Sequence, residues 1–274
     1  MDLPDRPEPL PVPVVDTHCH LDVTQRHSGL EPGIAIDWAA EVGVSRIVQI
    51  GCDVAGSRWA VEAAERWPGV VAGVAIHPND AARLGPELPA ALAVVDGLAS
   101  HPRVRAVGET GLDYYRTRDA AGQAVQRRTF GAHIAMAKAH SKTLVVHDRD
   151  AHADVLDVLD GEGPPDRIVM HCFSGDADFA RACVSRGAYL SFAGPVTFKP
   201  NEPLREALAV TPLDRVLVET DAPYLTPMPL RGRPNASYLV PHTVRFMADT
   251  LALDLERLGQ ALADNASAAF GGGW

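Results

Sequence analysis

Six residues of this chain have the side-chain types and the spacing that metal chemistry needs. His18 and His20 form an H-x-H pair at the end of an apolar run. Alternate residues of a strand point to the same face, so both imidazoles can face one metal ion, although such a pair also occurs as a polar strand end. The other candidates, each at the end of a strand-like run, are Glu109, His147, His171 and Asp221. Imidazole and carboxylate donors suit Zn²⁺, Mn²⁺ or a related ion, and the lack of a cysteine cluster argues against a closed structural zinc site.

Two candidate carboxylates, Glu109 and Asp221, lie at the ends of apolar runs that should be buried. Glu109 lies in GETGLDYY, directly after an apolar run, where an isolated buried carboxylate is costly unless a cation compensates it. A metal ion is one such cation, and a salt bridge to Arg103 or Arg149 is the alternative. Asp221 in LVETDAPY follows the same logic. Glu219, two residues earlier on that strand, shares its face and is a candidate for orienting a metal ligand.

The remaining histidines need sorting by position. His147 and His171 end the runs LVVH and IVMH; one alone would fit a hydrogen-bonded core residue, but two on adjacent strands favour ligands. His77 follows another strand and precedes a proline, and we expect it to contact substrate rather than metal. We expect surface or capping roles for the histidines in loops and helices: His27, His101, His133, His140, His152 and His242.

Eight apolar runs must position these residues. They cover residues 14–20, 46–52, 70–78, 103–111, 143–149, 167–175, 188–194 and 215–223. Continuous apolar runs are typical of parallel strands buried on both faces. Segments with helical periodicity lie between them, at 57–67, 86–99, 120–140 and 176–186, and a final helical region covers 240–263 after a long loop at 226–238. The alternation predicts an α/β fold, a (β/α)8 TIM barrel with its site at the carboxyl ends of the strands; an open doubly wound sheet is the alternative.

Length and composition set further limits. A chain of 274 residues fits one barrel domain, so we predict a single domain over 1–274, with a flexible proline-rich leader at 1–11. The net charge of −10 argues against broad coating of nucleic acid, but not against local binding of a chain end. No apolar run reaches the ~18 residues of a membrane span, and no export signal is present. The four cysteines lack C-x-x-C spacing and are expected to be reduced core residues. We expect a cytoplasmic monomer with no membrane partner.

An ordered set of motifs resembles the TatD family of metal-dependent hydrolases in the amidohydrolase superfamily. The motifs are VVDTHCHLD, AIHP, GETGLDYY, HDRDA, HCFSG, LSFAGPVTFK, ETDAPYL and NASAAFG. The resemblance implies two divalent cations per chain, Mg²⁺, Mn²⁺ or Zn²⁺. It implies that His18, His20 and Asp221 hold one ion, that His147 and His171 hold the second, and that Glu109 bridges them. Ala75, Thr110 and Ala268 depart from the family pattern without touching these positions.

The same resemblance implies a 3′–5′ exodeoxyribonuclease that acts on single-stranded DNA or 3′ ends through a bridging hydroxide, with Asp221 as general base and Glu109 as catalytic bridge. The expected substrate contacts are His77, Arg149, Tyr114 and Tyr224. Further candidates are Lys199, Arg231 and Arg233 for phosphates, and Tyr115 and Phe173 for bases. An amidohydrolase acting on a small amide, ester or lactone is the alternative enzyme, and a non-catalytic metal-binding scaffold is a third possibility.

Overall fold

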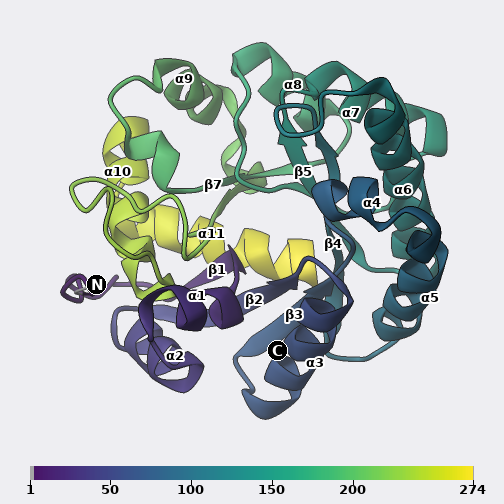
Figure 1. Ribbon diagram of the computed structural model, residues 1–274. Helices are drawn as coiled ribbons and strands as arrows, with labels where there is room; N and C mark the ends of the chain where they lie inside the picture. The colour runs from purple at the N-terminus through teal and green to yellow at the C-terminus, as the bar shows by residue number, and fades with distance from the viewer. Residues whose placement is uncertain (1–2, 274) are drawn as a thin grey trace.

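Eight parallel strands form a closed barrel in the computed structural model, which describes residues 3–273 (Figure 1). The strands pair in chain order: β1 Val14–Cys19, β2 Val44–Gly51, β3 Val70–Val74, β4 Val104–Asp113, β5 Thr143–Arg149, β6 Ile168–Met170, β7 Tyr189–Phe192 and β8 Val216–Val218. The first and last strands of the sheet meet near Asp221. Its amide donates to the carbonyl of His18 at 2.9 Å, and Cys19 forms a parallel β-bridge with Ala222. Each predicted run overlaps a strand, with β2 beginning two residues earlier and β4 ending two residues later than predicted, and the closure excludes the open doubly wound sheet.

Both faces of the strands are buried, which explains why the runs are continuously apolar. Val15, Val48 and Val145 belong to a cluster in the barrel interior. Their neighbours Val14 and Ile47 belong to the larger cluster between the strands and the helices. Successive side chains of a strand point to opposite faces, so a strand buried on both faces loses the polar alternation of a surface strand.

Helices surround the barrel (Figure 1). They are α1 Leu21–Ser28, α2 Pro32–Glu41, α3 Val54–Arg66, α4 Pro78–Leu84, α5 Leu88–Ala99, α6 Ala120–Ala139, α7 His152–Glu162, α8 Ala177–Ser185, α9 Glu202–Val210, α10 Val240–Leu251 and α11 Leu255–Phe270. Side-chain caps fix several starts: Asp53 accepts a hydrogen bond from the amide of Gly56 at α3, and Asp119 accepts one from Gly122 at α6.

The carboxyl-terminal region differs from the single helical segment predicted at 240–263. The chain turns at Ala252, whose φ of 51° is left-handed, and α11 then continues to Phe270. Ala266, Ala269 and Phe270 pack into the interior cluster of the barrel, and the hydroxyl of Thr143 donates to the carbonyl of Ala269 at 2.5 Å. Helix α11 therefore closes one end of the barrel, crossing behind it in Figure 1, and leaves the carboxyl ends of the strands open.

The first described residues run alongside α10. The Tyr238 hydroxyl donates to the carbonyl of Pro4 at 2.9 Å, Arg245 donates to that of Glu8 at 2.8 Å, and Leu10 is buried. The flexibility of residues 1–11 and the single-domain organisation stay predictions. Among residues 3–273, no helix combines the length and hydrophobicity needed to cross a membrane.

Candidate metal centre

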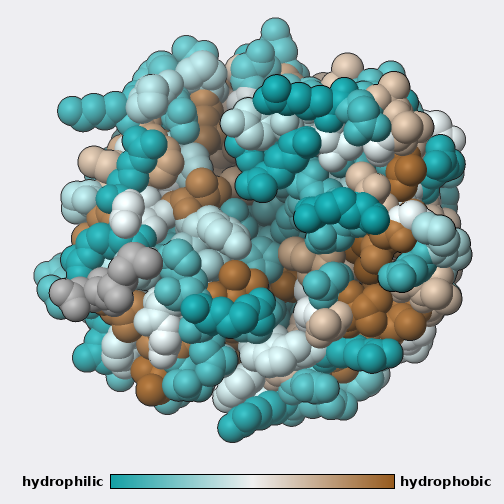
Figure 2. Space-filling view, in the orientation of Figure 1, coloured by the Kyte–Doolittle hydropathy of each residue, from teal (hydrophilic) through white to brown (hydrophobic). Residues whose placement is uncertain are grey.

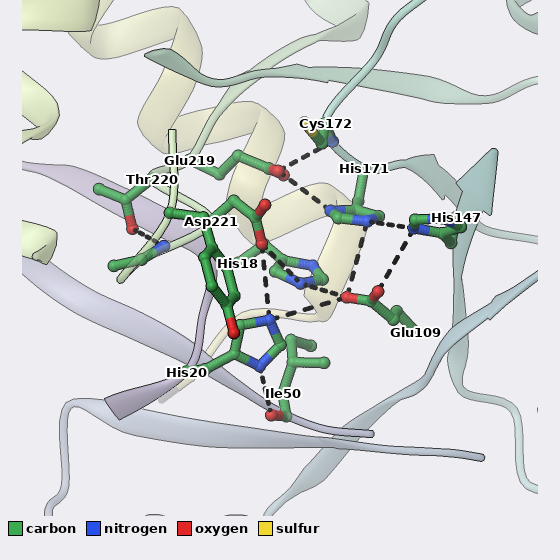
Figure 3. A network of polar contacts seen from close by, with 12 residues as sticks. His18, His20, Ile50, Glu109, His147, His171, Cys172, Glu219, Thr220 and Asp221 are labelled. Atoms are coloured by element: carbon green, nitrogen blue, oxygen red, sulfur yellow. Dashed lines mark hydrogen bonds and ion pairs between the residues drawn. The ribbon is translucent and has the colours of Figure 1, made fainter. Parts of the chain in front are cut away.

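The six predicted donor residues converge at the open end of the barrel (Figure 3). They lie on five strands or within three residues of their carboxyl ends: β1, β4, β5, β6 and β8. All six side chains are buried or nearly so, with Asp221 and His147 the most exposed at 15% and 17%. Positions scattered over two hundred residues of sequence are therefore brought together by the strand order alone.

Local irregularity in β4 directs Glu109 toward this centre. The pairing of β4 with β5 shifts register between Val107 and Thr110, and such irregularities re-aim side chains next to active sites. Gly111 has a φ of 129°, and a Cβ on it would clash with the carbonyl oxygen of His147. Glycine at this position therefore lets the strands that carry Glu109 and His147 approach closely.

Four residues form the first donor group. His18 Nε2 lies 2.7 Å from Glu109 Oε2, and His20 Nε2 lies 3.5 Å from Asp221 Oδ1. Each residue offers one ligand atom, and these atoms all lie within 4.8 Å of one another. Two imidazoles and two carboxylates at this separation could hold one metal ion.

The second side of Glu109 faces other histidines. Its Oε1 lies 3.4 Å from His147 Nδ1, which in turn lies 3.3 Å from His171 Nε2. Two facing ring nitrogens at this distance need a proton or a metal ion between them, because two lone pairs repel. Glu109 thus directs Oε1 to His147 and Oε2 to His18, and its Oε2 also lies 3.6 Å from His171 Nε2, so the carboxylate is within reach of both donor groups.

His77 lies closer to the donors than a purely peripheral residue would. Its Nε2 is 3.0 Å from Glu109 Oε1, and His77, Glu109 and His147 form a further potential ligand group. Its Nδ1 accepts a hydrogen bond from the amide of Asn79 and so caps α4. With Nδ1 accepting, Nε2 of the neutral ring carries the proton toward Glu109, which disfavours metal ligation through Nε2, and the preference for substrate stays a prediction.

Hydrogen bonds on the far side of two rings fix which nitrogen faces the centre. His20 Nδ1 donates to the carbonyl of Ile50 at 3.0 Å, and His171 Nδ1 lies 3.1 Å from Glu219 Oε1. Carbonyl and carboxylate oxygens accept hydrogen bonds, so in each neutral ring Nδ1 carries the proton. Nε2 then keeps its lone pair for a metal ion. Glu219 also accepts from the amide of Cys172 at 2.8 Å and holds the position expected of an orienting group.

Asp113 plays the corresponding part for His147, and the sequence reasoning missed it. Its Oδ2 lies 3.5 Å from His147 Nε2 and accepts from Asn79 Nδ2 at 2.8 Å, and its Oδ1 accepts from the amide of Arg116. Burial raises the pKa of the Asp113 carboxyl, but hydrogen bonding to His147 and Asn79 lowers it below its ordinary value. A usable signal was present, because Asp113 follows Glu109 by four residues in the same GETGLDYY motif.

The electrostatics favour a cation. Burial alone raises the pKa of the Glu109 carboxyl, but the charge of His171 and contacts with His147 and His18 lower it well below its usual range. For Asp221, burial is likewise outweighed by the hydrogen bond to His20 and the charge of His171, so its pKa is lowered. Both carboxylates are therefore ionised at neutral pH.

The alternative of an arginine partner for Glu109 is wrong. Arg103 donates to the carbonyls of Ala64, Pro68 and Val70, and the Arg149 guanidinium lies 4.0 Å from the centre of the Tyr115 ring. Among residues 3–273, Glu109 has only histidines as ion-pair partners. The site has more buried negative charge than arginine or lysine compensates.

Orphaned polar atoms indicate that the residues present fit a metal ion. Within the described part of the chain, both ring nitrogens of His18 and Oε2 of Glu109 lack a hydrogen-bond partner. His18 Nε2 and Glu109 Oε2 are near each other but not aligned for a hydrogen bond. A buried polar atom without a partner is costly, and a metal ion between these atoms removes the cost.

Backbone strain and a clamp hold Asp221. Its φ of 54° is left-handed, a conformation that costs energy and must be fixed by surrounding contacts. Buried Asp16 accepts from both the amide and the hydroxyl of Thr220, at 2.9 and 2.7 Å. Buried Asn235 donates to the carbonyls of Thr220 and Tyr224 on the other side of Asp221. The Asp221 carboxylate is thereby held toward His20.

Comparisons with known proteins agree with this geometry. A family model described as TatD related DNase matches residues 15–271. The chain belongs to the TatD family. It is 44% identical to the uncharacterized metal-dependent hydrolase TatD of Mycobacterium tuberculosis, over 95% of this chain and 99% of the relative. It is 37% identical to the uncharacterized metal-dependent hydrolase YabD of Bacillus subtilis, over 93% and 98%. The fold matches a crystal structure of YJJV, a TatD homolog of Escherichia coli, with a TM-score of 0.87 and 24% identity over 95% and 98% of the chains.

As a member of the TatD family, the chain is a metal-dependent hydrolase, and a hollow of about 590 Å³ lies over its donors. Figure 2 shows this hollow near the centre of the face, bordered by hydrophilic residues. Three predicted substrate contacts line it: His77, Arg149 and Tyr224.

Tyr114, the fourth predicted substrate contact, does not line this hollow. Its hydroxyl donates to Asp154 at 2.6 Å and accepts from Arg127 at 2.7 Å, away from the donors. Its neighbour Tyr115 is exposed at 48%. Of the further candidates, Phe173 is buried in an aromatic stack, and Arg231 lies over Phe198. Lys199 and Arg233 also do not line the hollow.

Two further expectations need correction. His133 is fully buried on α6, where its Nε2 accepts from the amide of Ile76 at 3.2 Å, so its predicted surface or capping role is wrong. Of the four free cysteines, Cys19 and Cys183 are core residues as expected. Cys52 and Cys172 are only partly buried and line the hollow, because they lie one and two residues after the ends of β2 and β6.

Proposed function

We propose that this TatD-family hydrolase cleaves phosphodiester bonds of DNA and trims single strands from the 3′ end, using two divalent cations. The observation that carries the proposal is Glu109, whose two oxygens face different histidines, 2.7 Å from His18 and 3.4 Å from His147. The choice of DNA is supported by the description of the matching family model. A shared carboxylate between two donor groups is typical of sites that handle both the attacking and the leaving oxygen of a phosphodiester.

In this proposal His18, His20 and Asp221 hold one cation, His147 and His171 hold the other, and Glu109 contacts both. When bound, such cations make water a stronger nucleophile and offset the negative charge that develops on the phosphate oxygens. Glu219 and Asp113 keep the rings of His171 and His147 in the ligating orientation.

Asp221 is the proposed general base. Its lowered pKa keeps the carboxylate ionised at neutral pH, so it can accept the proton of the attacking water. Its partial exposure and its place in the lining of the hollow give that water access. The contacts of Asp16 and Asn235 around Asp221 hold the base in place without adding a competing proton donor to its carboxylate.

Residues around the hollow would orient the substrate. Arg149 can bind a phosphate, because a guanidinium offers several donors in a fixed plane. Tyr224 is exposed at 52% and can stack on a terminal base. His77 lines the hollow beside Glu109, where its ring would contact the substrate.

The test starts from chelator-treated protein to which Mg²⁺, Mn²⁺ or Zn²⁺ is restored. Single-stranded DNA labelled at the 5′ end should then shorten stepwise, and the same strand labelled at the 3′ end should release its label first. Hydrolysis of a small amide, ester or lactone in place of DNA would instead support the amidohydrolase alternative. Metal binding with no hydrolysis of any substrate would support a scaffold.

Substitutions separate the roles. Asp221→Asn removes the base and should lower kcat by about 100-fold or more. Glu109→Gln should reduce metal content as well as activity, because an amide is a weaker ligand than a carboxylate. Glu62→Gln, at an exposed carboxylate on α3, is the matched control and should change neither. Full activity of Asp221→Asn with normal metal content would contradict the assignment of the base.

A further inference from the structure

A second hollow continues from the metal centre across the surface between α4 and the start of α6. Its volume is about 970 Å³, and it shares Asn79, Arg83 and Arg116 with the hollow over the donors. Its outer part is lined by Tyr115, Arg118 and the first turn of α6. The two hollows thus adjoin at these three side chains, and together they mark a path from the donors outward. Figure 2 shows strongly hydrophilic residues on the side of the central hollow toward α4.

Positive charge is concentrated along this path although the chain carries a net charge of −10. Arg116, Arg118 and Arg149 are exposed, and within residues 3–273 none of them forms an ion pair with a carboxylate. Arg83 is partly compensated by Asp80 at 3.3 Å. Because unpaired arginines attract phosphates, a local basic strip on an acidic protein favours an anionic occupant.

An aromatic ring lies within this basic strip. Tyr115 is about half exposed; the guanidinium of Arg149 lies 4.0 Å from its ring centre, and that of Arg118 lies 5.8 Å away. Arg118 also donates to the carbonyl of Tyr115 at 3.2 Å, which ties the two residues together. An exposed ring among arginines is the combination with which proteins bind single-stranded nucleic acid, by stacking on bases and pairing with phosphates.

We infer that this second hollow binds the single-stranded nucleotides on the 5′ side of the scissile bond, with Tyr115 as a stacking platform and Arg118 and Arg116 as phosphate contacts. The inference rests on the proposed function: if the 3′-terminal nucleotide is cut at the metal centre, the rest of the strand extends from there on the 5′ side of the scissile bond. It assigns to the enzyme a preference for strands long enough to reach Tyr115.

Tyr115 and Arg118 are suited to the test because they line the second hollow but not the one over the donors. Tyr115→Ala and Arg118→Ala should each raise KM for an oligothymidylate of about 20 nucleotides by roughly tenfold. Arg118→Ala should leave hydrolysis of a p-nitrophenyl ester of thymidine monophosphate unchanged, since this probe reaches only the metal centre; for Tyr115→Ala, whose ring contacts Arg149, the loss on the oligothymidylate should exceed any loss on this probe. Tyr115→Phe keeps the ring and should behave as the parent protein. Arg257→Ala, at an exposed arginine on α11, is the matched charge control.

Binding is measured separately from catalysis, in the Asp221→Asn background, by fluorescence anisotropy of the same labelled oligothymidylate. Adding Arg118→Ala should weaken binding and reduce the slope of log Kd against log salt by about 0.7, the value for one lost phosphate contact on a single strand. Unchanged binding in both Tyr115→Ala and Arg118→Ala would overturn the inference, as would binding of an acidic peptide in place of DNA. If the oligothymidylate binds through Tyr115 and Arg118 but neither phosphodiester is hydrolysed, the proposed function fails while the binding groove stands.

Discussion

At the scale of single residues, the centre depends on two carboxylates that contact donor histidines from behind. Glu219 and Asp113 each lie behind one histidine, at 3.1 Å from His171 Nδ1 and 3.5 Å from His147 Nε2. Glu219 could be predicted because it shares a strand face with Asp221. Asp113 was missed although it lies in the same motif as Glu109, because β4 was expected to end at residue 111 and instead continues to Asp113. Strand ends depend on pairing with a neighbour, which one sequence does not display.

Asp113→Asn should therefore weaken metal binding without abolishing it. An amide at this position can no longer hold the His147 ring by charge, and loss of such a partner typically costs 10- to 100-fold in metal affinity, as a rough expectation. Titration of metal-free protein against a chromophoric chelator measures the change. Asp154→Asn, which removes a carboxylate bonded to Tyr114 away from the donors, is the control and should keep the parent affinity. Equal affinities for the two variants would contradict the role given to Asp113.

At the scale of elements, His133 links α6 to the strands that carry Glu109 and His77. Its Nε2 accepts from the amide of Ile76, and its Nδ1 lies 2.9 Å from both the carbonyl of Thr129 and the hydroxyl of Thr110. The eight strands could be predicted because burial on both faces leaves a continuous apolar run. The role of His133 could not, since the groups around it come from strands distant in sequence. The extent of α11 depends in the same way on its docking into the barrel.

The burial of His133 makes stability depend on pH. Burial lowers its pKa from 6.5 to about 4, with the hydrogen bond to Thr129 opposing part of the shift. The unfolded chain therefore takes up this proton first, so the stabilisation is complete above pH 6.5 and is lost as pH falls toward 4. At about 1.4 kcal/mol for each unit of pKa, the loss amounts to about 3 kcal/mol.

Urea unfolding of metal-free protein from pH 7 down to about pH 4 measures this loss. His133→Gln keeps an acceptor for the amide of Ile76 but cannot take up a proton, so its free energy of unfolding should fall less steeply by that amount. His27→Gln, at an exposed histidine on α1, should follow the parent protein. Parallel curves for His133→Gln and the parent would mean that His133 does not control the acid sensitivity.

At the scale of the whole molecule, the two ends of the barrel differ in polarity: one is apolar and the other is rich in carboxylates. Helix α11 fills one end with apolar side chains, and the other end gathers Glu109, Asp113, Glu219 and Asp221 with no lysine or arginine side chain ion-paired to them among residues 3–273. Histidines next to these carboxylates lower the pKa values of Glu109, Asp113 and Asp221, so the open end depends on positive charge from histidine or from a bound cation. This view makes metal binding part of the stability of the fold, because cations that bind only the folded chain shift the unfolding equilibrium.

Metal removal should accordingly lower Tm. At a free metal concentration about 1,000 times Kd, one bound ion adds about 4 kcal/mol, and a chain of this size shifts by about 2 °C or more for each kcal/mol. We expect calorimetry to show Tm falling by roughly 10 °C after chelation and recovering when metal is restored. Glu109→Gln should lose most of this response, since it removes the carboxylate shared by the two donor groups, while Glu62→Gln should retain it. Because the histidines around Glu109 lower its pKa well below the usual range, the carboxylate also stabilises the metal-free fold, and the metal-free Tm of Glu109→Gln should lie below that of the metal-free parent. An equal or higher value would show that the histidine contacts of Glu109 do not stabilise the metal-free barrel.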